Sequence, residues 1–150
     1  MNIRPFGIAD TEAVVALWQA CELVRPWNDP YKDILRKLSV NAELFLLGEV
    51  QGTRGNELVA GAMFGYEGHR GWLNYLAVAP AWRRKGFAAQ LMVRGEHLLL
   101  LCGCPKINLL VRSGNAEALA MYEKLGYTPD HSVSLGKRLI PDTPLPFKEP

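Results

Sequence analysis

Long hydrophobic runs are scarce in this sequence of 150 residues. The longest unbroken aliphatic run covers only residues 98–101, whereas a membrane-spanning helix needs about 20 apolar residues. We therefore predict no membrane-spanning helix and no membrane partner. The first residues also lack the apolar segment and the cleavage site of a signal peptide, which favours a cytoplasmic location.

Cysteine and histidine are equally sparse, with three residues of each. No cluster of them has the spacing of metal ligands, so we predict no metal site. An odd cysteine count favours reduced thiols. Cys102 and Cys104 flank a single glycine, which allows a redox pair, although two small residues at a helix-to-strand connection are the better interpretation.

Strong charge of one sign is also missing. The formal net charge is +2 at pH 7, which does not favour a nucleic-acid partner. With 49% hydrophobic and 21% charged residues, the composition is typical of a globular protein. The length fits a single domain, which we place at residues 1–140. The Pro-rich tail at residues 141–150 is predicted to be extended or disordered.

Hydrophobic periodicity and turn residues predict an α/β (α+β) fold in a single domain. The expected helices cover residues 11–23, 31–38, 86–101 and 116–125. The expected strands cover residues 3–6, 43–50, 58–66, 72–78, 106–111 and 132–139. This order indicates a mixed central sheet of about six to seven strands, flanked by about four helices.

The most informative segment is the turn that precedes the helix expected at residues 86–101. Arg83, Arg84 and Lys85 stand directly before it, although a helix N-terminus already carries about half a positive charge. The turn holds no acidic or hydroxyl cap, so the first backbone N–H groups lack a side-chain partner. Gly86 keeps the backbone open to approach. A bound phosphate or pyrophosphate would explain these features together, and a solvated basic helix start is the alternative.

Two motifs resemble the signatures of the GNAT acetyltransferases. The run Arg83-Arg84-Lys85-Gly86-Phe87-Ala88 resembles the family pattern R-x-x-G-x-A. The pattern N-x-x-A-x-x-x-Y-x-x-x-G-[FY] is matched by Asn115, Ala118, Tyr122, Gly126 and Tyr127. Both motifs occur in the family's order, separated by one expected strand. Over roughly residues 1–140 the chain therefore resembles a bacterial single-domain GNAT N-acetyltransferase.

The resemblance implies acetyl-CoA as the co-substrate. The family's backbone contacts to the pantetheine arm correspond to Leu76, Ala77 and Val78. The pyrophosphate cradle corresponds to Arg83, Arg84, Lys85, Gly86, Phe87 and Ala88. Asn115 matches an asparagine that contacts the cofactor arm, which is compatible with capping its helix. Because family members often form dimers, we also expect that a homodimer can form.

The implied reaction is direct transfer of the acetyl group to a primary amine in a ternary complex, by an acyltransferase of class EC 2.3.1. Tyr122 matches the tyrosine near the cofactor sulfur and is the implied general acid, with aromatic packing on the sheet as the alternative. Leu110 stands where some relatives carry a glutamate base. Glu67 is our candidate base instead, with His69 and a water-mediated route as alternatives.

The acceptor, a small-molecule amine or a protein amine, is not identified by the sequence. Candidate substrate-binding residues are Trp27, Tyr31, Tyr66 and Tyr75, because aromatic groups suit a cationic amine. Packing in the core or at its rim is the alternative for Trp27 and Tyr75. The competing function is a non-catalytic sensor module of the same fold that binds acyl-CoA.

Overall fold

The computed structural model describes residues 1–142 of the chain. The α-helices of this part are α1 (Thr11–Ala20), α2 (Pro30–Leu38), α3 (Phe87–Leu101) and α4 (Ala116–Lys124). The strands are β1 (Asn2–Pro5), β2 (Phe45–Gly52), β3 (Gly55–Tyr66), β4 (Gly71–Val78) and β5 (Ile107–Leu109). Short 3-10 helices lie at Ile8–Asp10, Ala42–Leu44 and Pro80–Trp82.

The five strands form one mixed sheet in the order β1-β2-β3-β4-β5. The pairs from β1 to β4 are antiparallel; hairpins join β2 to β3 and β3 to β4, whereas α1 and α2 lie between β1 and β2. The pair β4·β5 is parallel, because α3 carries the chain back across the sheet between these strands. The alternation of helices and strands thus confirms the predicted mixed α/β class.

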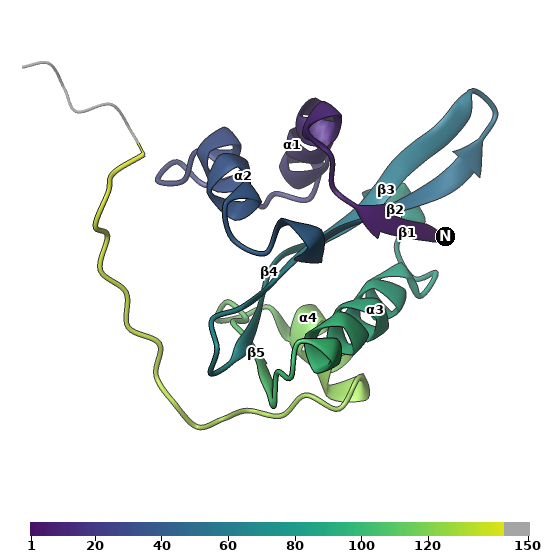
Figure 1. The fold of residues 1–150 in the computed structure, drawn as a ribbon. Helices are drawn as coiled ribbons and strands as arrows, with labels where there is room; N and C mark the ends of the chain where they lie inside the picture. The colour runs from purple at the N-terminus through teal and green to yellow at the C-terminus, as the bar shows by residue number, and fades with distance from the viewer. Residues whose placement is uncertain (143–150) are drawn as a thin grey trace, which may run out of the picture.

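The helices cover the two faces of the sheet in pairs (Figure 1). α1 and α2 lie on one face, where Trp18 stacks between Phe45 and Tyr75 in the core. α3 and α4 lie on the other face, where Leu91 and Met92 are fully buried. The sheet therefore has a core on each side, and residues at the end of β4 are held between two packed layers.

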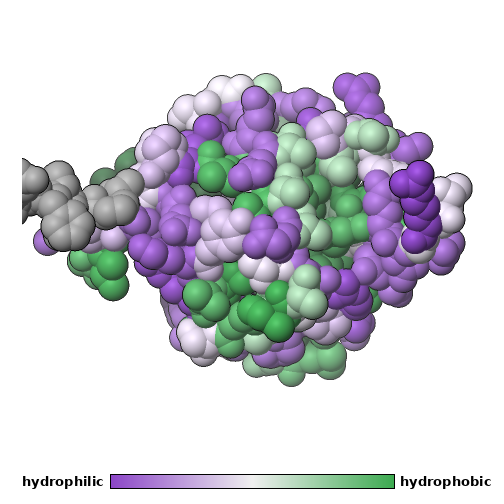
Figure 2. All heavy atoms as spheres, turned by 90° about the horizontal axis from the view of Figure 1, so that it is seen from above, coloured by the Kyte–Doolittle hydropathy of each residue, from purple (hydrophilic) through white to green (hydrophobic). Residues whose placement is uncertain are grey.

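The view from above shows the face that carries α1 and α2 (Figure 2). Hydrophilic residues cover its right-hand end, over the turn between β2 and β3. Hydrophobic and hydrophilic residues are interspersed elsewhere on this face. Within residues 1–142, no helix is both long and apolar enough to cross a membrane.

The strand expected at residues 132–139 is wrong for this structure, which has five strands within residues 1–142 rather than six to seven. This segment lies exposed and unpaired, with Val133 at 85% and Leu135 at 91% exposure. It runs past β5 and up to α2 (Figure 1). A strand needs hydrogen bonds from a neighbour, and the path of this segment brings none. Asp142 ends the described chain in a buried position, and residues 143–150 of the predicted tail lie outside the described residues.

Candidate functional site

The turn before α3 has an unusual backbone. Arg84 has φ of 61° and Gly86 has φ of 77°, so two residues of the turn are left-handed. This conformation is strained for arginine. When left-handed and right-handed residues alternate along a turn, their backbone N–H groups converge on one point. Gly86 stands at the N-cap of α3 and provides no side-chain hydrogen bond to the helix. The predicted uncapped helix start is thus present.

The backbone N–H groups of residues 84–89 have no hydrogen-bond acceptor within residues 1–142. The cationic side chains next to them are exposed. Arg83 donates its Nε to the carbonyl of Val78 at 3.2 Å, and Lys85 lies 5.9 Å from the ring centre of Trp82. A row of free amides, a helix dipole and nearby cations is the arrangement that binds phosphate groups.

A pocket of about 750 Å³ opens where β4 and β5 diverge. The two strands pair only between Gly71–Leu73 of β4 and Ile107–Leu109 of β5; β4 then continues to Val78 without β5, paired with β3 alone. The gap is closed by the loop after α1, by α2 and by α4. Its lining residues are Leu23, Arg25, Asn28, Asp33, Arg36, Lys37, Met63, Leu73, Asn74, Tyr75, Leu76, Leu109, Leu110, Val111, Arg112, Asn115, Ala118 and Tyr122.

A β-bulge lies in the wall of this pocket. Gly61 pairs with Ala77 and Met63 with Asn74, so a single residue of β3 faces two residues of β4. One of these two is Tyr75, whose φ of 53° is left-handed. Bulges take backbone groups out of the ladder, and such strain persists mainly where function requires it. The bulge can therefore present a backbone N–H to a ligand in the pocket.

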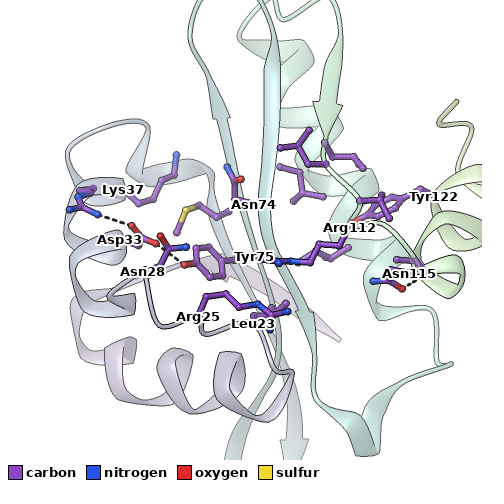
Figure 3. A pocket seen from close by; sticks show the side chains of 18 residues that line it. Leu23, Arg25, Asn28, Asp33, Lys37, Asn74, Tyr75, Arg112, Asn115 and Tyr122 are labelled. Atoms are coloured by element: carbon purple, nitrogen blue, oxygen red, sulfur yellow. Dashed lines mark hydrogen bonds and ion pairs between the residues drawn. The ribbon is translucent and has the colours of Figure 1, made fainter. Parts of the chain in front are cut away.

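The Tyr75 side chain is fixed from two sides. Its ring stacks on Trp18 with centroids 3.9 Å apart, and its hydroxyl donates to Asp33 at 2.6 Å. Burial and this hydrogen bond raise the pKa of Tyr75. Arg36 donates to the other oxygen of Asp33 at 3.0 Å. Tyr75 is therefore a rigid, protonated part of the pocket wall (Figure 3).

Tyr122 and Asn115 approach the pocket from α4 (Figure 3). The Tyr122 side chain is buried, and its hydroxyl has no protein partner within residues 1–142. Burial raises the pKa of Tyr122 to about 12. Asn115 accepts a hydrogen bond from the backbone N–H of Ala118 at 3.1 Å, which is the predicted N-cap contact. Its amide nitrogen is left for a ligand, and the Tyr122 hydroxyl is left as a proton donor.

The β4 residues expected to contact pantetheine lie at different depths. Leu76 lines the pocket, whereas Ala77 is buried in the core below it. The carbonyl of Val78 accepts from the thiol of Cys21 at 3.3 Å as well as from Arg83. Phe87, at the start of α3, is half-buried and its ring stacks on Trp82 with centroids 6.0 Å apart. Ala88, the next residue, has a small side chain that leaves the backbone of this turn accessible.

Glu67 does not reach the pocket. It lies in the exposed loop between β3 and β4, where its carboxylate accepts from the backbone N–H groups of His69 and Arg70. These hydrogen bonds lower the pKa of Glu67. The carboxylate caps its own loop, and neither it nor His69 is among the lining residues. The geometry gives no support to either residue as the base.

Of the aromatic residues expected at the acceptor site, only Tyr75 lines the pocket. Trp27 is 53% exposed beside the C-terminal segment. Tyr31 donates its hydroxyl to Glu12 at 3.0 Å, and Tyr66 donates to the carbonyl of Gly68 at 3.1 Å. Both hydroxyls are therefore engaged away from the pocket.

Charged residues that the motifs did not indicate line the pocket instead: Arg25, Asp33, Arg36, Lys37 and Arg112. They come from the loop after α1, from α2 and from the segment after β5. Only Arg112 adjoins a recognised motif. The others carry no local signal, because the fold alone brings them together. Within residues 1–142 no group of His, Cys, Asp and Glu side chains has the geometry to hold a metal ion.

Comparisons with known proteins agree with this geometry. Residues 12–127 match the model of the Acetyltransferase (GNAT) family. An acetyltransferase of Yersinia pestis (strain Pestoides F) is 50% identical over 142 residues, which is 95% of this chain and 98% of that protein.

Two solved structures have a similar fold. Ard1 from Thermoplasma volcanium has a TM-score of 0.74 and 25% identity, with 85% of this chain and 82% of that chain covered. A NatC complex bound to Gag peptide and CoA has a TM-score of 0.71 and 20% identity, with 83% and 82% covered. With the family match, the close relative and this fold in agreement, the chain belongs to the GNAT family of acetyltransferases.

Proposed function

We propose that this protein transfers the acetyl group of acetyl-CoA to an amine by direct attack in a ternary complex. The observation that supports the proposal most is the set of free backbone N–H groups at residues 84–89. They stand at the start of α3, beside the pocket between β4 and β5. A diphosphate on these amides would direct the rest of the molecule along β4 toward Tyr122.

The residues fit the parts of acetyl-CoA in order. The amides after Arg83 and the helix dipole suit the diphosphate, and the exposed side chains of Arg84 and Lys85 add positive charge. The pantetheine arm would follow Leu76, where β4 has lost its β5 neighbour. The free amide nitrogen of Asn115 suits a carbonyl of that arm. When bound, acetyl-CoA supplies an activated thioester carbonyl.

The pocket provides a hydrogen-bond donor for the developing oxyanion and a proton donor for the departing sulfur. The neutral amine attacks the thioester carbonyl, a C–N bond forms and the C–S bond breaks. A backbone N–H of the bulge at Tyr75 would stabilise the developing oxyanion. Tyr122 donates its proton to the departing sulfur and recovers a proton from solvent. The amine nitrogen loses one proton, so charge and protons balance over the reaction.

The proton of the amine leaves by a water-mediated route. Asp33 is the only carboxylate among the lining residues of the described chain, and Tyr75 and Arg36 occupy its oxygens. Glu67 is held by its own loop. Water in the pocket can accept the proton and pass it to solvent, since the pocket is open.

The test combines binding and turnover. Titration calorimetry should show that CoA binds and that ATP, which lacks pantetheine, binds at least tenfold more weakly. Thiol release from acetyl-CoA is then measured over a broad panel of primary amines, with secondary alcohols of matched size as the control. Release that depends on an amine supports the proposal. Tight CoA binding without release over the whole panel would contradict it and favour an acyl-CoA sensor.

A further inference from the structure

Two arginine side chains enter the pocket without a partner. Arg25 comes from the loop after α1 and Arg112 from the segment after β5; Arg112 extends toward Tyr75, and Arg25 lies below Tyr75 beside Leu23 (Figure 3). Neither guanidinium donates a side-chain hydrogen bond within residues 1–142; Arg25 is half-buried with a buried Nε, whereas Arg112 is exposed. A buried N–H group without an acceptor is unfavourable by about 1–3 kcal/mol. Such a group in a ligand pocket indicates a missing acceptor.

Within residues 1–142, neither Arg25 nor Arg112 forms an ion pair with a carboxylate. Arg36 and Lys37 also line the pocket, but Arg36 is paired with Asp142 at 2.6 Å as well as with Asp33. Asp33 already accepts from the Tyr75 hydroxyl and from Arg36. Lys37 donates to the carbonyl of Val40 at 2.9 Å. Arg25 and Arg112 are therefore the cationic lining residues that have no partner within residues 1–142.

The diphosphate of acetyl-CoA is not the missing anion. None of residues 83–88 is among the lining residues of the pocket. The free amides of the turn already provide a separate phosphate site at the start of α3. The pocket instead holds Tyr122 and Leu76, which lie at the proposed thioester end. A second anion at this end must come from the acceptor.

We propose that the amine acceptor also carries a carboxylate, which Arg25 and Arg112 bind. This inference rests on the proposed function, because it names the class of acceptor. A carboxylate takes two parallel hydrogen bonds from a guanidinium and satisfies the buried Nε of Arg25. The chemistry is shared by small amino acids and by peptides whose first residue is acidic. It adds a carboxylate site to the pocket that Tyr75 also lines.

The experiment uses two matched pairs of acceptors. γ-Aminobutyrate and γ-aminobutyramide represent small amino acids, and the tripeptide amides Asp-Ala-Ala and Asn-Ala-Ala represent peptides. Within at least one pair, kcat/KM should be about 10- to 100-fold higher for the carboxylate member, the range expected for hydrogen bonds between charged groups. The pair that shows the preference identifies the source of the carboxylate. Equal rates within both pairs would overturn the inference.

Variants assign the preference to the two arginines. R25Q and R112Q should each remove most of the preference while changing kcat/KM of the neutral members less than about threefold. The CoA dissociation constant should stay unchanged. R54Q, at the exposed turn between β2 and β3, is the control and should keep the preference. If R25Q impairs folding, as judged by circular dichroism, R112Q decides alone. A preference retained in both folded variants would contradict the assignment.

Calorimetry separates this inference from the proposed function. If no acceptor is acetylated, the proposed function fails, but binding of the same four compounds to the CoA complex still tests the carboxylate site. Tighter binding of a carboxylate member, lost in R112Q, would support the site without catalysis. Equal or undetectable binding of all four compounds would contradict the proposed carboxylate site.

Discussion

At the scale of the residue, the surroundings of Tyr122 decide which chemistry the pocket can perform. The side chain is 9% exposed, yet it lines the pocket. Burial raises the pKa of its hydroxyl to about 12, because the charged phenolate would lose hydration. The hydroxyl therefore keeps its proton at neutral pH, as a general acid must.

Replacing Tyr122 by Phe removes the hydroxyl and keeps the ring. We expect kcat to fall about 100-fold or more, whereas the dissociation constant of CoA should change less than about twofold. In the unchanged protein, kcat should rise with pH as the amine loses its proton. No fall due to Tyr122 should occur below about pH 11, since its pKa is about 12. Steady-state kinetics from pH 6 to the limit of stability, with calorimetry, measures both effects.

Tyr127→Phe is the matched control. Tyr127 packs edge-on against Tyr122 with ring centroids 5.8 Å apart, and its hydroxyl donates to Glu96 at 2.7 Å. Loss of this hydrogen bond should lower the free energy of unfolding by about 1 kcal/mol and leave kcat nearly unchanged. An equal fall of kcat in both variants would show that packing, rather than proton donation, is the role of Tyr122.

Local signals predicted some of these residues and could not predict others. Asn115 precedes a helix, and Gly86 follows three cations, so both are recognisable from their neighbours in the sequence. Arg25 and Arg112 meet only because β5 returns beside β4 below the loop after α1. The expectation that Glu67 is the base rests only on its position in the loop between two expected strands. The sequence did not show that this carboxylate would bind its own backbone.

At the scale of the element, the position of α3 depends on its close approach to the sheet. A Cβ added to Gly95 would clash with Cζ of Phe64, a fully buried ring of β3. Only a residue without a side chain lets the helix reach this depth. The N-terminus of α3 carries the free amides, so the same contact also positions the proposed phosphate site.

Gly95→Ala should therefore destabilise the protein. In an open helix position the same change would stabilise by about 1 kcal/mol, but here overpacking should lower the free energy of unfolding by about 1–3 kcal/mol. Urea unfolding followed by circular dichroism measures the difference. Gly136→Ala is the control, because an added Cβ meets nothing within 4 Å there. Equal stability of Gly95→Ala and the unchanged protein would show that α3 shifts freely.

Helices were easier to predict than the last strand. Each helix satisfies its backbone hydrogen bonds within one segment, so periodicity and caps are sufficient signals. A strand depends on a neighbour that the segment itself does not specify. Residues 132–139 hold spaced apolar residues such as Val133 and Leu135, but their path leads away from β5 to α2. The strand expectation failed for this reason.

At the scale of the whole molecule, the C-terminal segment connects the two faces of the sheet. After α4 it reaches α2, where Asp142 accepts from the backbone N–H of Asp29 at 2.8 Å and from Arg36 at 2.6 Å. Lys32 donates to the Asp142 carbonyl at 3.1 Å. Arg138 binds Asn28 at 2.6 Å nearby. These contacts fix the end of the described chain beside the pocket wall.

Asp142→Asn should weaken this connection in a pH-dependent way. Hydrogen bonds from Arg36 hold the pKa of Asp142 well below its usual range. A lowered carboxyl pKa stabilises the folded state above the unfolded value of about 3.9, and this stabilisation is lost as pH falls. The unchanged protein should have the higher Tm at pH 7, and its advantage should shrink below about pH 4. Glu117→Gln on exposed α4 is the control for loss of one charge; a Tm difference independent of pH would contradict this role.

The most direct test compares two glycines at opposite ends of α3. Gly86 has φ of 77° and Gly103 has φ of 78°, and a Cβ at either position meets nothing within 4 Å. Valine at either site should therefore cost a similar backbone strain of about 1–2 kcal/mol. Only Gly86→Val would also block the free amides. Calorimetry with CoA should show binding weakened at least about 100-fold in Gly86→Val and nearly unchanged in Gly103→Val, whereas equal dissociation constants for both variants would contradict a diphosphate site at the start of α3.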